Sequence, residues 1–206
     1  PIENKIVFAT YFPKNDNYDI FFMDEDGTNK ENLTNSPNYE KFPQFSPDGS
    51  YIIYQSWIAG KMEIFFFGLL DRNTVNITRQ PKSNDIISHG NCFSPDGELI
   101  VFTSERDGNK NIYLSNISGT KVEQLTNHES NDFEPTFSPD GELIIFTSER
   151  DGNKEIYSID MRSKGIKNLT NNRGDDWNPR FYPDGQKIIF QSSRDNNWEI
   201  YMMNLN

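Results

Sequence analysis

Residues 93–113 read FSPDGELIVFTSERDGNKNIY, and residues 137–157 read FSPDGELIIFTSERDGNKEIY. The second copy begins 44 residues after the first, and 19 of the 21 positions are identical. The turn tetrapeptide S-P-D-G, or Y-P-D-G in the last case, occurs at residues 46–49, 94–97, 138–141 and 182–185. Self-similarity at a fixed period indicates a repeat architecture, here with a period of 44 to 48 residues.

Each repeat predicts four short strands. S-P-D-G suits a type I turn, because proline fixes φ at the second position and glycine fits the fourth. The strand that follows, such as Leu99–Phe102, is apolar at consecutive positions, which is typical of a strand buried on both faces. A third strand carries Ile-Tyr or Ile-Phe, and a fourth carries Leu-Thr or Ile-Thr. Four-stranded sheets stacked around an axis fit this pattern, so the predicted fold class is an all-β β-propeller.

Counting strands predicts five four-stranded antiparallel blades in a single domain, residues 1–206. The first blade lacks its innermost strand and the last lacks its outermost strand. An open sheet edge invites pairing, so we expect either a segment of a longer chain or edge pairing with another chain. The expected blade boundaries are approximately 1–35, 36–79, 80–127, 128–171 and 172–206.

The ordered motifs P-x-F-S-P-D-G, I-x-F-x-S-x-R-D-G, E-I-Y and L-T resemble the WD-like repeat of TolB-type β-propellers. The blades are also similar to the propeller domain of prolyl oligopeptidase-type enzymes. The resemblance covers nearly the whole chain and is weaker in the first repeat and at residues 88–92. It implies a non-catalytic scaffold and protein-interaction module in the bacterial envelope, hence a periplasmic or extracellular location. TolB carries an additional N-terminal domain that these repeats do not include, so the resemblance implies no particular partner.

Composition restricts the class of partner. The chain has 31 acidic and 20 basic residues, a net charge of −11. This balance argues against binding nucleic acid or an anionic membrane surface, both of which need clustered Lys and Arg. No run of 18 apolar residues occurs, so no membrane span is expected. The predicted partner is a protein or peptide. The acidic balance is compatible with a basic partner or a cation, and solubility alone is the alternative reading of the charge.

The candidate binding residues are those that differ between repeats at the entry to each first strand. In propellers this loop opens onto one mouth of the axial channel, and rigid scaffolds place ligand sites on such variable loops. We predict an acidic and aromatic mouth that favours a cationic group. No organic cofactor is expected, and a divalent cation at the mouth is an option. A polar rim that only solvates the channel is the alternative reading. The predicted mouth residues are Glu40, His89, Asp132, Glu134, Asp176, Trp177 and Arg180.

No catalytic motif is recognisable: the G-x-S-x-G elbow and the Walker A loop are missing, and the chain has two histidines. We therefore predict that the chain is not an enzyme. One alternative is a glycoside hydrolase, which would need two of the carboxylates Glu40, Asp132, Glu134 and Asp176 about 5–9.5 Å apart. A purely structural segment of a longer repeat protein is the other alternative.

Arginines recur at one position of three repeats, as Arg106, Arg150 and Arg194. Glu155 and Glu199 stand across the hairpin from the last two, so the sequence predicts two cross-strand ion pairs. A residue that is repeated in several blades is expected to hold each blade together rather than to build one site.

Overall fold

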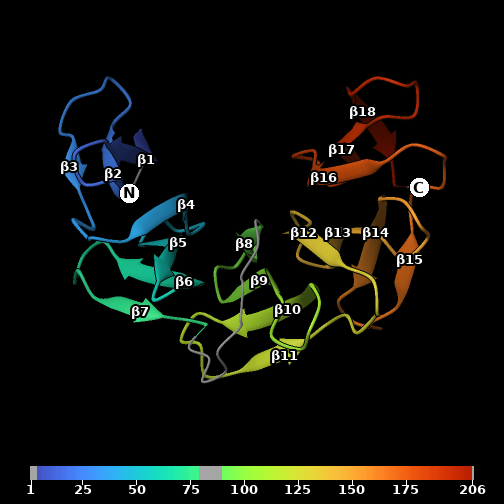
Figure 1. Cartoon of the computed structure of the whole chain (residues 1–206), viewed down its shortest axis with the longest axis horizontal. Coiled ribbons are helices and arrows are strands. Elements are labelled where there is room, and N and C mark those ends of the chain that lie inside the picture. Colours follow the sequence, from blue (N-terminus) through green and yellow to red (C-terminus); the bar gives the residue numbers. More distant parts are fainter. Residues whose placement is uncertain (1–3, 79–89, 206) are drawn as a thin grey trace. The chain divides into compact units, whose positions relative to one another are not determined.

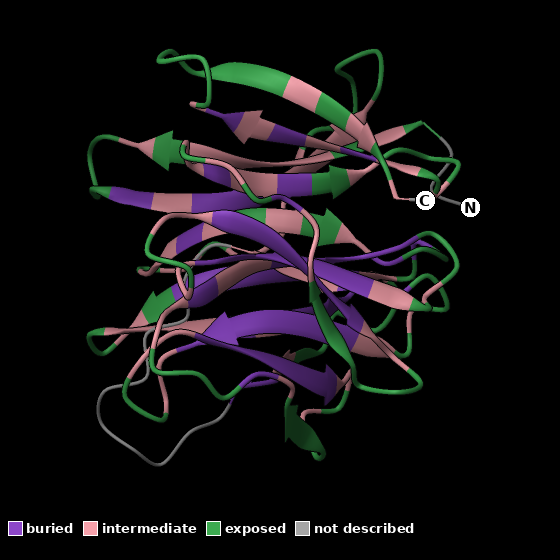
Figure 2. Cartoon of the chain, turned by 90° about the vertical axis from the view of Figure 1, so that its right-hand side faces the viewer, coloured by how far each residue is buried: buried purple, intermediate pink, exposed green. Residues whose placement is uncertain are grey.

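The computed structural model describes residues 4–78 and 90–205, which form eighteen β-strands and no α-helix. Within each blade, consecutive strands pair antiparallel (Figure 1). Buried residues run along the strands, and exposed residues gather in the connecting turns (Figure 2). In this part of the chain, no helix has the length and apolar character needed to cross a membrane.

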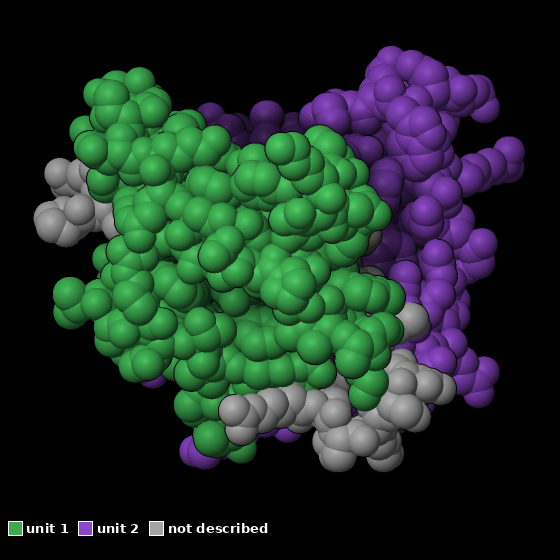
Figure 3. Space-filling view, turned by 60° about the vertical axis from the view of Figure 1, so that its left-hand side comes forward, with its two compact units in different colours: residues 1–87, 117–120 green, residues 88–116, 121–206 purple. Residues whose placement is uncertain are grey.

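The chain divides into two compact units, which Figure 3 shows in different colours: residues 1–87 with 117–120, and residues 88–116 with 121–206. We call them unit 1 and unit 2. Unit 1 holds the strands of the first two blades, and a single parallel bridge between Tyr18 and Tyr39 joins them. The strands of unit 1 are β1 (Lys5–Phe12), β2 (Asn17–Asp24), β3 (Glu31–Asn32), β4 (Tyr39–Phe45), β5 (Tyr51–Ile58), β6 (Lys61–Gly68) and β7 (Thr74–Asn76).

Unit 2 contains three separate antiparallel sheets, one for each remaining blade. The third blade is formed by β8 (Asn91–Phe93), β9 (Leu99–Ser104), β10 (Asn111–Asn116) and β11 (Val122–Gln124). The fourth is formed by β12 (Asp132–Phe137), β13 (Leu143–Ser148), β14 (Glu155–Asp160) and β15 (Ile166–Asn168). The fifth has three strands, β16 (Asp176–Phe181), β17 (Lys187–Ser192) and β18 (Glu199–Asn204).

Each S-P-D-G segment forms the turn between the first and second strands of its blade. In the fourth blade, the amide of Gly141 donates to the carbonyl of Ser138 at 2.9 Å, as a type I turn requires. Gly141 has a φ of +76°, a conformation that glycine adopts without a steric penalty. The hydroxyl of Ser138 donates to Asp140 at 2.5 Å and accepts from the amide of Leu143 at 2.9 Å. The turn therefore satisfies its own polar groups.

The threonine of the Leu-Thr or Ile-Thr motif ties the fourth strand to the third. In the fourth blade the hydroxyl of Thr170 accepts a hydrogen bond from the amide of Ile156 at 2.8 Å. Thr170 is buried, so an unpaired amide there would cost free energy. The same bond recurs in the first three blades, from Ile20 to Thr34, Ile64 to Thr78 and Ile112 to Thr126.

The second strand of each complete blade in unit 2 is buried on both faces. On β13, Ile144 and Phe146 belong to one buried cluster, which they share with Val101 of the third blade. Ile145 lies in a different cluster, with Ile188 of the fifth blade. Adjacent residues on one strand thus pack against different blades, because successive side chains point to opposite faces. Each fully buried side chain contributes about 1.5–3 kcal/mol.

These observations confirm the predicted all-β propeller architecture with five blades, of which the first and last are incomplete. They also confirm the position of the S-P-D-G turns and the double burial of the second strands β5, β9 and β13, whereas β17 is buried at alternate positions only. The organisation of residues 1–206 as a single domain, with the boundaries given above, stays a prediction.

Candidate functional site

The first strand of a blade enters through a β-bulge that the sequence analysis missed. The register shifts between Lys41 and Gln44 on β4, and at the equivalent places on β12 and β16. The residue before the proline has a positive φ in all three cases: 55° at Phe42, 56° at Glu134 and 55° at Asn178. A bulge redirects the side chains beside it, and bulges are frequent next to functional sites.

Gly90 fills the equivalent position in the third blade, with a φ of +106°. A Cβ atom there would lie 2.7 Å from the Cα atom of Glu134, which is closer than two non-bonded carbon atoms approach in proteins. The signal was available in the sequence, because glycine appears in the one repeat that lacks the proline. A residue that can adopt a positive φ is needed at this register position in each of the four blades that have this strand.

Asp132 and Asp176 sit at the start of the bulged strands and are fully buried. Arg150 donates through Nη2 to both carboxylate oxygens of Asp132, at 3.1 and 2.9 Å. Arg194 makes the same ion pair with Asp176, at 2.8 Å. Neither aspartate therefore presents an exposed carboxylate. Both hold a strand to its own blade.

The predicted ion pairs of Arg150 with Glu155 and of Arg194 with Glu199 are wrong. The guanidinium groups turn toward the first strand of the blade, where a fully buried aspartate needs a counter-ion. Glu199 is exposed to water, and Glu155 is buried but has hydrogen-bond donors of its own. Glu155 instead accepts hydrogen bonds from Thr170 at 2.6 Å and from the amide of Asn172 at 3.0 Å.

Glu134 links two blades of unit 2. Its Oε2 atom accepts a hydrogen bond from the amide of Asn178 at 3.0 Å, and the hydroxyl of Thr147 lies 3.4 Å away. Asn178 occupies the bulge of the fifth blade, so the Glu134 carboxylate braces the next strand entry. The Glu134 side chain is half-buried, and its hydrogen bond from Asn178 connects the fourth blade to the fifth.

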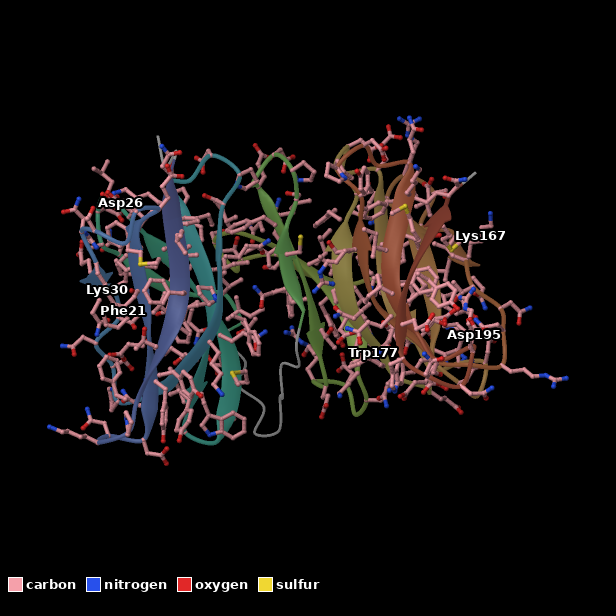
Figure 4. All side chains as sticks on the ribbon, turned by 90° about the horizontal axis from the view of Figure 1, so that it is seen from above. Phe21, Asp26, Lys30, Lys167, Trp177 and Asp195 are labelled. Carbon is pink, nitrogen blue, oxygen red and sulfur yellow. The ribbon has the colours of Figure 1, made fainter. Side chains whose placement is uncertain are left out.

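Two tryptophans gather at the fifth blade. The rings of Trp177 and Trp198 meet edge to face, with centroids 5.9 Å apart. Lys154 lies over Trp177 at 5.1 Å from the ring centroid. Figure 4 places Trp177 toward the same end of unit 2 as Asp195. Asp195 belongs to the turn between β17 and β18, which also contains Trp198. Arg180, on the same strand as Trp177, is exposed and donates to the carbonyl of Pro179 at 2.7 Å.

A hollow of about 460 Å³ adjoins this tryptophan pair. Trp198 lines it and is 55% exposed, a large fraction for a side chain of this size. We call it the blade-5 hollow; its charged wall consists of Arg173, Asp175 and Arg194.

Glu40 lies in unit 1, at the position that Asp132 occupies in the fourth blade. It is 3% exposed, and its Oε2 atom has no hydrogen-bond partner. Burial raises the pKa of Glu40 above its ordinary value, and the nearby Asp19 carboxylate adds to the rise. The nearby hydroxyl groups of Thr34, Ser36 and Ser56 act in the opposite direction and lower the pKa of Glu40.

His89, the remaining predicted residue, falls outside the described residues. Within residues 4–78 and 90–205, no group of three or more His, Cys, Asp or Glu side chains could hold a metal ion. Cys92 is half-buried and accepts a hydrogen bond from Thr136 through its sulfur at 3.7 Å. The structure thus places Glu134, Trp177 and Arg180 on the strand entries of unit 2 and buries Glu40, Asp132 and Asp176.

The family model of the TolB β-propeller domain matches residues 2–161. The Tol-Pal system protein TolB of Francisella tularensis is 33% identical to the chain over 112 residues, which cover 53% of the chain and 25% of that relative. The chain spans about a quarter of the length of the curated relatives it matches.

Solved structures agree with the sequence comparison. TolB from Acinetobacter baumannii superposes with a TM-score of 0.83 at 26% identity, over 100% of the chain and 51% of that protein. A prolyl endopeptidase structure gives a TM-score of 0.73 at 8% identity, over 98% of the chain and 33% of the enzyme. At that identity the second likeness concerns the fold alone.

Proposed function

Because the chain belongs to the TolB β-propeller domain family, we propose that it is a non-catalytic module that binds a protein or peptide of the Tol-Pal system in the bacterial envelope. The relative from Francisella tularensis carries that system in its name. Partner binding by blades of this kind needs no catalytic group. The buried ion pairs of Asp132 and Asp176 suit a rigid scaffold better than a glycoside hydrolase, which needs one protonated carboxyl group.

The single observation that supports the proposal most is the exposed tryptophan beside the blade-5 hollow. Tryptophan and arginine are enriched among residues that dominate binding energy at protein interfaces. Trp198 offers a large apolar surface, and the ring of Trp177 packs against it edge to face, which restricts its movement. Arg173 and Asp175 add charged groups on the wall of the same hollow.

The net charge of −11 favours a basic partner. Summed charge of one sign steers an oppositely charged protein toward the surface and raises the association rate. Glu134 and Arg180, at the neighbouring strand entries, would contribute polar contacts at the rim. A salt dependence of the association rate is therefore part of the proposal.

The test is calorimetric titration of the purified chain with the soluble domain of Pal, a protein of the Tol-Pal system, taken from the same organism. Trp198→Ala should weaken binding by about tenfold or more, a loss of roughly 1.4 kcal/mol or more. Trp57→Ala is the matched control, because Trp57 is 41% exposed and lies in unit 1. Its affinity should equal that of the unmodified chain.

Two results would contradict the proposal. One is an absence of saturable binding to Pal. The other is equal weakening by Trp57→Ala and Trp198→Ala, which would remove the blade-5 hollow as the contact surface. Both variants need circular dichroism spectra equal to that of the unmodified chain before the affinities are compared.

A further inference from the structure

The fourth blade contains a complete cradle for an arginine side chain. Arg150 donates to Asp132 through Nη2 and to the hydroxyl of Ser148 through Nε at 2.9 Å. Its guanidinium group also lies against a ring pair, 5.8 Å from the centroid of Phe146 and 4.6 Å from that of Tyr157. An acid, a serine hydroxyl and two aromatic faces together hold the planar cation.

The second blade has the same cradle but not the arginine. Glu40 pairs with Ser56 across β4 and β5, as Asp132 pairs with Ser148 across β12 and β13. Tyr54 and Phe65 form the ring pair, with centroids 5.7 Å apart. Two residues after the serine, where the fourth blade has Arg150, the second blade has Ile58.

The two atoms that the arginine would engage are left unsatisfied. Glu40 Oε2 and Ser56 Oγ are both buried and have no hydrogen-bond partner. Leaving such groups unpaired away from water is costly. A pocket of about 220 Å³ adjoins them, and Glu40, Tyr54, Ser56, Ile58 and Phe65 are among its lining residues. We call it the blade-2 pocket.

We propose that the blade-2 pocket binds a guanidinium group supplied by a ligand, as on the arginine side chain of a peptide. The carboxylate and the serine hydroxyl receive its N–H donors, and the ring pair receives its flat face. Further hydroxyl and amide groups of Thr34, Ser36 and Asn38 line the pocket and suit the remaining donors of the guanidinium. A divalent cation fits poorly, because calcium takes six to eight oxygen ligands and a single carboxylate lines this pocket.

The inference does not depend on the proposed function. Every residue that lines the blade-2 pocket belongs to unit 1, whereas the blade-5 hollow belongs to unit 2. The pocket would accept a guanidinium group whether or not the blade-5 hollow binds Pal.

The test is calorimetric titration with Nα-acetyl-arginine N-methylamide, and with the citrulline analogue as a neutral compound of the same shape. We expect one saturable site for the arginine compound. The citrulline compound should bind at least about tenfold more weakly. Ile58→Arg should fill the pocket with the chain's own guanidinium and abolish binding. Glu40→Gln should weaken it by about tenfold or more.

Glu31→Gln is the matched control, because the Glu31 side chain lies in unit 1 and is 44% exposed. Its affinity for the arginine compound should not change, nor should that of Trp198→Ala in unit 2. Equal binding of the arginine and citrulline compounds would overturn the inference. So would unchanged binding by a folded Ile58→Arg variant, or an absence of saturable binding with a Kd below about 1 mM.

Discussion

Asp132→Asn and Glu40→Gln remove a buried carboxylate from the same register position of two blades, and we expect opposite effects on stability. Asp132 is fully buried and receives two contacts from Arg150, whose side chain is 16% exposed. Neutralising Asp132 leaves the largely buried guanidinium group of Arg150 without its counter-ion. Breaking a buried pair by removing one partner costs about 3–5 kcal/mol. Because Arg150 keeps its contact with Ser148 and some access to water, we expect the lower end, about 3 kcal/mol.

Glu40 has no arginine partner, so its neutralisation should increase the free energy of unfolding at pH 7. The sign follows from linkage: the native pKa is raised, so the folded chain binds more protons than the unfolded chain above the ordinary carboxyl pKa. The Glu40 contribution to stability therefore falls as the pH rises through this window. The advantage of Glu40→Gln should be present at pH 7 and disappear below about pH 4, where both states are protonated.

Urea unfolding followed by tryptophan fluorescence at pH 7 and pH 4 measures both effects. Glu129→Gln is the control for Asp132→Asn, because Glu129 is an exposed carboxylate three residues before it. That control should change stability by less than about 0.5 kcal/mol. Equal losses in Asp132→Asn and Glu40→Gln at pH 7 would refute the reasoning, since they would show that Glu40 has a buried cationic partner of its own.

Further predictions concern the blade framework. Phe146→Ala should cost about 3–5 kcal/mol in urea unfolding, because Phe146 is fully buried between two blades; a loss below about 1 kcal/mol would mean that it is not in the core. Thr170→Val should cost about 1–3 kcal/mol by leaving the buried amide of Ile156 unpaired, and Thr170→Ser should recover most of the loss. Burial and a hydrogen bond to Asp151 raise the pKa of Tyr157 to about 12, so stability should fall between pH 10 and 12; the fall should be smaller in Tyr157→Phe, and equal falls would contradict it.

The blade framework could be predicted from the sequence because its determinants are local. The turn at Gly141 needs a tetrapeptide, and the bond from Ile156 to Thr170 joins two motifs 14 residues apart. Both recur at one period, so each copy supports the reading of the others. The count of five blades and the double burial of β13 followed from this recurrence.

The candidate site was harder to predict, because it depends on contacts that local sequence does not specify. Arg150 reaches Asp132, 18 residues away on the first strand, rather than Glu155 on the adjacent strand of its hairpin. The sequence placed Glu40 at the mouth, but only the fold shows that its side chain is buried. Aligning Ile58 with Arg150 would have revealed the missing cation in the second blade, since the register alone shows the exchange.

The alternation of buried faces along β13 bears on how such a chain can lengthen. Ile144 packs toward the preceding copy of the repeat and Ile145 toward the following one, so one 44-residue unit carries both halves of the same joint. A tandem duplication of that unit presents each new neighbour with a matching surface, without any change elsewhere. Sequence divergence can then start on one face while the other still fits its neighbour. The near-identity of residues 93–113 and 137–157 is what a recent duplication of this kind leaves behind.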